Sequence, residues 1–157
     1  PLARASHGER ASSQRRSAAS ARPARHGTAR AWERHVRLAL TEYRRKDDYI
    51  SEYPVLADGN GLQARVPVIA SDDGDGLATF LSELAESFRG WEGARHWRSL
   101  EDQLAIEASW QSRGHVLLRF RMRPSIYDLW TTSIDITVEA GEELKRLADD
   151  LQSFFLD

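Results

Sequence analysis

The stretch Leu104–Met122, "LAIEASWQSRGHVLLRFRM", predicts two neighbouring antiparallel strands and decides the fold class. Apolar and polar side chains alternate from Leu104 to Trp110, and they alternate again from Val116 to Met122. The segment "SRG" between these runs is typical of a tight turn. Strands with one apolar and one polar face are expected in an antiparallel sheet that has one covered face and one wet face.

The same alternation appears on both sides of this stretch. Residues 130–139, "WTTSIDITVE", predict a further strand of the same sheet. Upstream, residues 35–43, "HVRLALTEY", place Val36, Leu38 and Leu40 on one face. This pattern favours a half-buried strand, with a short helix as the alternative.

A hairpin is predicted between these regions. Residues 48–56 and 62–70 read as strands, and "DGNG" at residues 58–61 is a strong turn signal between them. Neither Pro54 nor Pro67 can donate a backbone hydrogen bond. We therefore expect both strands to be irregular or to lie at an edge of the sheet at those points.

Two amphipathic helices complete the pattern. Residues 77–88 carry apolar side chains at helical spacing, with Asp73 or Asp75 expected as the N-cap and Gly90 as the glycine after the last turn. Residues 144–154 show the same spacing after an acidic first turn. Both patterns predict a helix with one buried side.

The order of elements, β-β-β-α-β-β-β-α, predicts an α+β fold with two layers. We expect one antiparallel sheet of about six strands, with both helices on one of its faces. Residues 32–157 are long enough to form a single domain with its own core.

Residues 1–31 differ from the rest in composition. They contain seven arginines, one glutamate and a single large aliphatic residue, Leu2, so their net charge is +6 and the remaining residues carry −8 of the total of −2. A segment with so little apolar surface is expected to be a disordered basic tail. An upstream extension, an organelle transit peptide and a nucleic-acid-binding arm all fit this composition.

The overall composition excludes several classes of chemistry. The chain has no cysteine, which excludes disulfides, thiolate metal ligands and a cysteine nucleophile and fits a cytoplasmic location. No apolar run of about 18 residues is present, so we expect no membrane span. The partner classes left by these observations are proteins, small molecules and, through the basic tail alone, nucleic acids.

Motifs for cofactors, metals and nucleophiles are also missing. "GNGLQA" at residues 59–64 matches a dinucleotide-binding pattern, but a strand-like run follows it where a helix would be needed. "DDGDG" at residues 72–76 fails the spacing of a calcium loop, and no two histidines have metal-ligand spacing. We therefore predict no cofactor, metal or catalytic residue, and a non-enzymatic role is favoured.

Three arginines at period two form the first candidate surface: Arg119, Arg121 and Arg123. They are expected on one face of one strand. One interpretation is a salt-linked wet face, with Glu107 on the preceding strand and Asp135 or Glu139 on the following one lying opposite. The other is a charged surface for a protein or nucleic-acid partner, to which Leu117 and Tyr127 add contact area.

The second candidate is the segment "WEGARHW", in which Trp91 and Trp97 bracket Arg95 and His96. The tryptophans favour burial where the helix and the sheet meet. Arg95 and His96 are expected at the outside of this bracket. A pocket between helix and sheet that holds an anionic ligand, with Glu101 nearby, is the alternative interpretation.

Several marks give the chain a resemblance to a known group: Gly90, Trp91, Gly93, Trp97, Leu100, Gly114-His115-Val116 and Glu139-Ala140-Gly141-Glu142. Over residues 36–157 the chain resembles an uncharacterised family of small actinobacterial proteins. The resemblance implies a compact bacterial cytoplasmic domain, and it implies no reaction, cofactor or catalytic residue. The layout is also similar in kind to many immunity proteins of bacterial toxin systems.

These observations leave three hypotheses about function. The first is a protein-interaction module, with a toxin as one kind of partner. The second is a small-molecule-binding domain or enzyme that takes an anionic ligand near Arg95 and His96. The third is a nucleic-acid binder that acts through residues 1–31.

Overall fold

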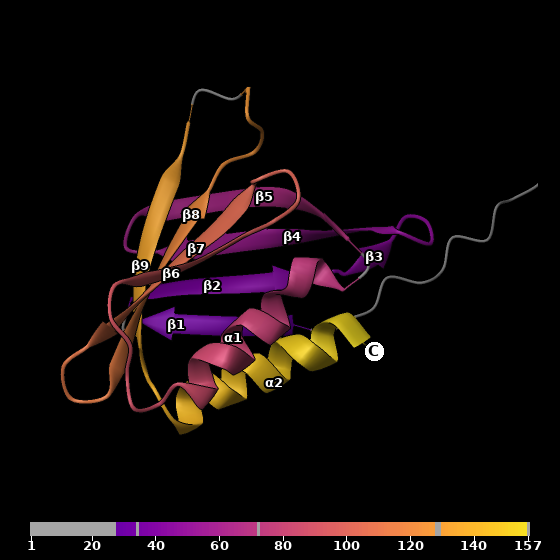
Figure 1. Cartoon of the computed structure of the whole chain (residues 1–157). Coiled ribbons are helices and arrows are strands. Elements are labelled where there is room, and N and C mark those ends of the chain that lie inside the picture. The colour runs from indigo at the N-terminus through magenta and orange to yellow at the C-terminus, as the bar shows by residue number, and fades with distance from the viewer. Residues whose placement is uncertain (1–27, 34, 72, 128–129, 157) are drawn as a thin grey trace, which may run out of the picture.

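The structure is a computed structural model that describes residues 28–33, 35–71, 73–127 and 130–156. Its elements, shown in Figure 1, are β1 (Thr28–Glu33), β2 (Val36–Thr41), β3 (Arg44–Arg45), β4 (Ile50–Gly59), β5 (Leu62–Ser71), the 3₁₀ turn η1 (Gly74–Gly76), α1 (Leu77–Glu86), β6 (Ala94–Arg98), β7 (Leu104–Gln111), β8 (His115–Met122), β9 (Thr132–Glu139) and α2 (Glu142–Leu156).

The strands form two antiparallel sheets, so the α+β class is confirmed and the expectation of one sheet of about six strands is wrong. Sheet A has the order β1-β2-β4-β5, with the short β3 paired to one end of β4. Sheet B has the order β6-β7-β8-β9. Alternation fixes which face of a strand is apolar, but it does not show whether two groups of strands share one sheet or face each other.

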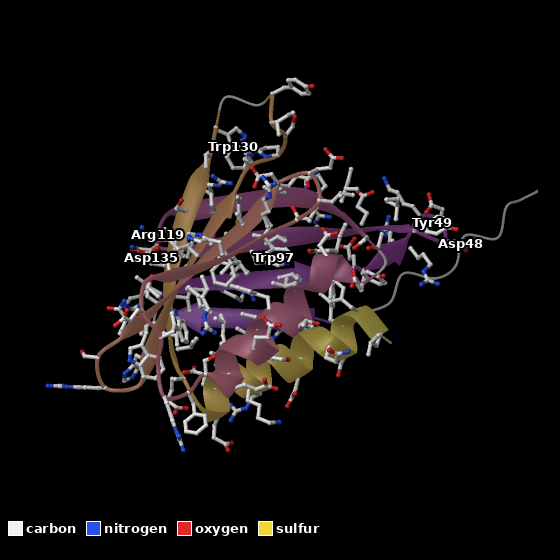
Figure 2. All side chains as sticks on the ribbon, viewed as in Figure 1. Asp48, Tyr49, Trp97, Arg119, Trp130 and Asp135 are labelled. Atoms are coloured by element: carbon white, nitrogen blue, oxygen red, sulfur yellow. The ribbon has the colours of Figure 1, made fainter. Side chains whose placement is uncertain are left out.

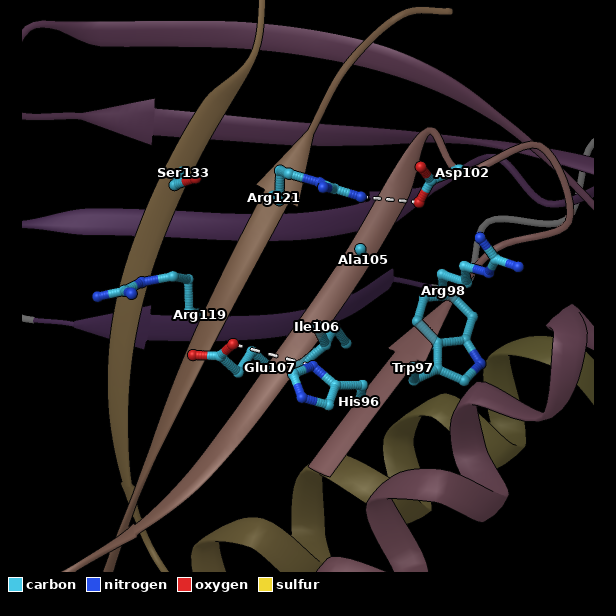
Figure 3. A pocket seen from close by; sticks show the side chains of 10 residues that line it. All are labelled: His96, Trp97, Arg98, Asp102, Ala105, Ile106, Glu107, Arg119, Arg121 and Ser133. Atoms are coloured by element: carbon cyan, nitrogen blue, oxygen red, sulfur yellow. Dashed lines mark hydrogen bonds and ion pairs between the residues drawn. The ribbon is translucent and has the colours of Figure 1, made fainter. Parts of the chain in front are cut away.

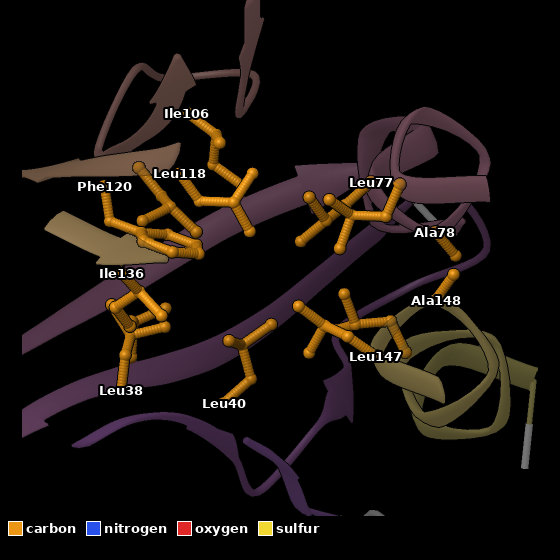
Figure 4. Packing of buried hydrophobic residues seen from close by; sticks show 14 of the residues in the cluster. Leu38, Leu40, Leu77, Ala78, Ile106, Leu118, Phe120, Ile136, Leu147 and Ala148 are labelled. Atoms are coloured by element: carbon orange, nitrogen blue, oxygen red, sulfur yellow. The ribbon is translucent and has the colours of Figure 1, made fainter. Parts of the chain in front are cut away.

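The core lies between the apolar faces of the two sheets and is closed by the helices. Figure 4 shows Ile106, Leu118 and Phe120 of sheet B directed toward Leu38 and Leu40 of sheet A. The helices lie side by side next to β1 (Figure 1), where both contribute leucines and alanines to the same cluster. The helices therefore fill the open side of a two-sheet sandwich, whereas the sequence predicted that they cover one sheet.

The hairpin of β4 and β5 agrees with its sequence signal. Asn60 and Gly61 adopt positive φ angles of 53° and 82° between the paired ends of the strands, as the commonest two-residue hairpin turn requires. Pro54 and Pro67 lie opposite each other in the ladder. On its other side β4 pairs with β2 and β3, and this pairing breaks at Tyr53 and Pro54, so the expected irregularity is confirmed.

The start of α1 differs from the expectation. Gly76, in a left-handed conformation, occupies the N-cap position, and no side chain caps the helix. Neither Asp73 nor Asp75 acts as the N-cap of α1. The carboxylate of Asp75 instead accepts hydrogen bonds from the backbone amides of Ser71 and Leu100. The helix ends at Glu86, so Gly90 lies beyond its cap.

Three of the strands were not predicted, and they are β1, β3 and β6. Residues 28–31, which the sequence assigned to the basic tail, belong to β1 and pair with β2. Residues 1–27, the remainder of that tail, lie outside the described residues. Neither helix of the described ranges has the length and apolar character needed to cross a membrane.

Candidate functional site

Strand β6 places Arg95 and His96 of the tryptophan bracket on opposite faces. Its exposure alternates, with Ala94, His96 and Arg98 exposed and Arg95 and Trp97 half-buried. Successive side chains of a strand point to opposite faces. The hypothesis that placed Arg95 and His96 in one pocket between helix and sheet is therefore wrong in its geometry.

Arg95 joins the inner side of the bracket. Its guanidinium lies 4.6 Å from the centre of the Trp91 ring and donates a hydrogen bond of 2.8 Å to Ser87 Oγ at the end of α1. Trp91 in turn meets Trp110 of β7 edge to face, with ring centres 5.6 Å apart. These contacts attach the end of α1 to sheet B, as the structural interpretation of the bracket expected.

Trp97 fixes the other end of the bracket. Its Nε1 donates a hydrogen bond of 2.8 Å to the backbone carbonyl of Asp75. The Asp75 carboxylate accepts hydrogen bonds from the backbone amides of Ser71, at 2.8 Å, and Leu100, at 2.7 Å. Trp91 and Trp97 are half-buried, and both pack against the core. Their main role is therefore structural, at the junction of sheet B with α1 and η1.

The outer face of sheet B carries a row of polar and charged side chains that crosses all four strands. His96 pairs with Glu107, Glu107 with Arg119, and Arg119 with Asp135. Arg119 donates two hydrogen bonds to Asp135, at 2.8 and 2.9 Å, and His96 Nδ1 lies 3.9 Å from Glu107 Oε2. The expectation that Glu107 and Asp135 lie opposite Arg119 is confirmed, whereas Glu139 faces His115.

The ion pair at the end of this row shifts the acidity of both groups. The hydrogen bonds from Arg119 hold the pKa of Asp135 below its usual range. The same bonds raise the pKa of Arg119 above its usual value. Both side chains are exposed, so solvent screens the pair and its contribution to stability is small.

The other two arginines of the predicted surface share one carboxylate. Asp102, in the turn before β7, accepts a hydrogen bond of 2.8 Å from Arg121 and a second, charge-assisted bond from Arg123. Arg123 also donates to the backbone carbonyl of Asp102 at 3.0 Å. The three arginines are therefore salt-linked, and Arg123 lies beyond the end of β8. Within the described part of the chain, Arg98 makes no ion pair.

A hollow of about 560 Å³ lies on this outer face, shown in Figure 3. The small side chain of Ala105 leaves a gap between long neighbours, and the walls include His96, Arg98, Glu107 and Arg121. The lining thus contains both cationic and anionic groups: Arg98, Arg119, Arg121, Asp102 and Glu107. Such a surface suits a polar ligand or a protein segment that carries complementary charges.

Comparison with known families shows to which family this chain belongs. The family of unknown function DUF6228 matches residues 29–157. The chain belongs to this family. The comparison confirms the predicted resemblance to an uncharacterised family. The matched range begins at residue 29, seven residues before the expected limit at residue 36. A comparison with curated proteins found no match.

Every residue of the candidate site falls within the part of the chain that matches DUF6228. In the described ranges of this family member, no three His, Asp or Glu side chains are placed to hold a metal ion together. The site as described is a hollow whose lining includes the side chains of two ion pairs, Arg121–Asp102 and Arg119–Asp135, through Arg121, Asp102 and Arg119.

The connection between β8 and β9 adds an exposed apolar group that sequence reasoning largely missed. Ile126 is 54% exposed, Tyr127 87% and Trp130 43%, and Figure 2 shows Trp130 beyond the ends of the strands. Of these residues only Tyr127 was predicted as part of a contact surface. The sequence placed Trp130 on the apolar face of the strand predicted at residues 130–139, but β9 begins at Thr132, so this part of the prediction is wrong.

Proposed function

We propose that this DUF6228 member is a protein-interaction module that binds its partner through the outer face of sheet B and the β8–β9 connection. The observation that carries the proposal is that the exposed Tyr127 and Trp130 lie in the connection between β8 and β9, the two strands that contribute Arg119, Arg121 and Ser133 to the charged hollow. Aromatic anchors surrounded by polar groups are the usual arrangement of protein interfaces.

The anchors and the hollow are linked through β8 and β9. Arg121 and Ser133 line the hollow and pair across β8 and β9. The next pair, Met122 and Thr132, ends both strands, and the connection that carries Tyr127 begins directly after it. A partner that covers the aromatic side chains would therefore also reach the charged rows of the sheet.

The ion pairs on the outer face of sheet B would contribute more to the specificity of partner binding than to its affinity. Arg119 and Asp135 hold each other in a two-bond geometry before any partner arrives, so little side-chain entropy is lost on binding. Arg98, which has no ion pair within the described residues, can pair with an acidic group of a partner. A toxin remains one candidate partner, on the basis of the similarity in layout to immunity proteins alone.

Affinity capture with matched variants tests the proposal. The full chain and the variant Tyr127→Ala/Trp130→Ala are each used as bait in lysate, and a partner retained by the wild type is expected to be lost from the variant. Removing a central aromatic anchor typically costs about 2 kcal/mol, roughly thirtyfold in affinity. Tyr49→Ala is the control, because Tyr49 is 79% exposed on a different part of the surface (Figure 2). Equal capture by all three baits would contradict the proposal.

A second candidate function is small-molecule binding in the hollow, favoured by its volume of about 560 Å³ and by Arg98, which makes no ion pair among the described residues. An anionic ligand would then raise the melting temperature of the wild type, and Arg98→Gln and His96→Ala would abolish this shift without unfolding the protein. Arg95→Ala should leave the ligand-induced shift intact, because Arg95 lies on the other face of β6. A screen of anionic metabolites by thermal shift distinguishes this function from protein binding.

A further inference from the structure

A second hollow, separate from the face of sheet B, lies between the two helices. Its volume is about 500 Å³, and it is bounded by the last turns of α1 and the first turns of α2. Small residues, Ala85 and Ala148, form part of its lining, and Phe88 stands at its end with 57% of its surface exposed. We call this feature the helix groove.

The helix groove has a strongly acidic rim. Its lining includes Glu86, Glu139, Glu142 and Asp149 but only one cationic residue, Lys145. Lys145 already pairs with Asp149 at 3.1 Å, and Glu139 accepts the backbone amide of Gly141 at 3.0 Å. Within the described residues, Glu86 and Glu142 have no ion pair or hydrogen-bond partner for their carboxylates. The groove therefore offers two unpaired anionic groups beside an exposed aromatic ring.

Arginine is the residue that suits such a surface best. Its guanidinium pairs with carboxylates and stacks on aromatic rings, while its aliphatic stem covers apolar surface. Phe88 already shows this behaviour, since the guanidinium carbon of Arg89 lies 5.6 Å from the centre of its ring. A segment with several arginines would neutralise the rim and cover Phe88 at the same time.

The chain itself carries such a segment. Residues 1–27 contain six arginines and one glutamate, so their net charge is +5, whereas the remaining residues carry −7. They lead directly into β1, which lies against α2. We propose that the helix groove binds the arginine-rich residues 1–27 of the same chain.

The tether is long enough for this contact. The 15 residues of α2 span about 22 Å, while 27 residues of extended chain reach roughly 90 Å. A tethered segment acts at an effective concentration of about a millimolar, so modest affinity is sufficient. The contact depends on exposed charges, so it weakens as salt concentration rises.

Paramagnetic broadening in the full chain tests this proposal. The sequence has no cysteine, so Ser13→Cys gives a single site for a nitroxide label. The label is expected to broaden the amide resonances of Ser82, Ala85 and Ala148 at low salt, and much less at 0.5 M NaCl. The amide of Gly61, in the β4–β5 turn, serves as the internal reference and should remain sharp.

Charge reversal supplies the matched control. In the labelled chain, Glu86→Lys/Glu142→Lys should abolish the broadening at the groove. Asp48→Lys/Glu101→Lys changes the net charge by the same amount at exposed positions outside the groove, and it should keep the broadening. No broadening at the groove in the parent chain, or equal broadening in both double variants, would overturn the proposal. Broadening that passes from labelled chains to unlabelled isotope-enriched chains would show that the occupant is a second copy, which also overturns it.

Discussion

The indole nitrogen of Trp97 donates a hydrogen bond of 2.8 Å to the backbone carbonyl of Asp75 and so ties sheet B to the turn that leaves sheet A. Asp75 lies in η1, between β5 and α1, and Trp97 lies in β6. The Asp75 carboxylate reinforces the junction through the amides of Ser71 and Leu100. Asp75 thus receives hydrogen bonds from the end of β5, from Trp97 in β6 and from Leu100 shortly after β6.

Removing the indole donor should destabilise the fold by a modest amount. Trp97→Phe keeps an aromatic ring against the core but leaves the Asp75 carbonyl without this partner, at an expected cost of about 1 kcal/mol in the free energy of unfolding. Urea denaturation measures the change. Trp130→Phe, at an exposed tryptophan, is the control and should have an effect near zero. A Trp97→Phe variant as stable as the control would show that the hydrogen bond contributes nothing.

The Asp75 carboxylate should contribute more to the free energy of unfolding than the nearby Asp73 carboxylate does. Asp75→Ala leaves the amides of Ser71 and Leu100 without their acceptor and removes a residue type that tolerates the observed positive φ of 58°. We expect a loss of about 2–3 kcal/mol in unfolding free energy. Asp73→Ala removes an exposed carboxylate that, among the described residues, accepts a hydrogen bond from Ser71 Oγ alone, and the loss in unfolding free energy should stay below about 1 kcal/mol. Equal losses would contradict the role assigned to Asp75.

Two glycines of the bracket form a matched pair for backbone and packing effects. A Cβ atom at Gly90 would lie 2.9 Å from the Trp110 ring, whereas at Gly93 it would meet nothing within 4 Å, although both glycines have positive φ. Gly93→Ala should cost about 1 kcal/mol from backbone strain alone. Gly90→Ala should cost roughly 1–3 kcal/mol more, because the tryptophan must move. Thermal unfolding of both variants gives the comparison.

The Arg119–Asp135 pair predicts a small acid-dependent stability. The pKa of Asp135 is lowered in the folded state, so its stabilising effect is present above the ordinary carboxyl pKa and is lost as the pH falls through the folded value. The melting temperature of wild type should exceed that of Asp135→Asn by a small constant amount above about pH 5, and the difference should disappear once the pH falls below the lowered pKa of Asp135. A difference that grows toward low pH would have the wrong sign for this ion pair.

Strands with regular alternation could be predicted from the sequence, and strands without it could not. Residues 104–122 predict β7 and β8 because every second side chain in each strand is apolar. The five residues of β6, "ARHWR", offer only one apolar side chain on the inner face, so their period cannot be recognised. The beginning of β1 was assigned to the tail because arginine and alanine carry no strand signal.

The charged pairs of the candidate site could be predicted from the sequence, but the position of β6 beside them could not. The row through Glu107, Arg119 and Asp135 follows from the registers of neighbouring hairpins, which alternation fixes. His96 joins this row only because β6 pairs with β7, and the sequence gives no sign of that pairing. For the same reason Arg95 could not be assigned to the inner face before the structure was known.

The central claim is that the β8–β9 connection and the adjoining sheet face contact a protein partner, and site-specific photo-crosslinking tests it most directly. A photoreactive phenylalanine replaces Tyr127 in one full-length chain and Tyr49 in another, and both are irradiated with native lysate. We predict a discrete covalent adduct from position 127 that Arg98→Gln or Trp130→Ala weakens, and no such adduct from position 49. The same adduct from both positions, or none from position 127, would contradict the claim.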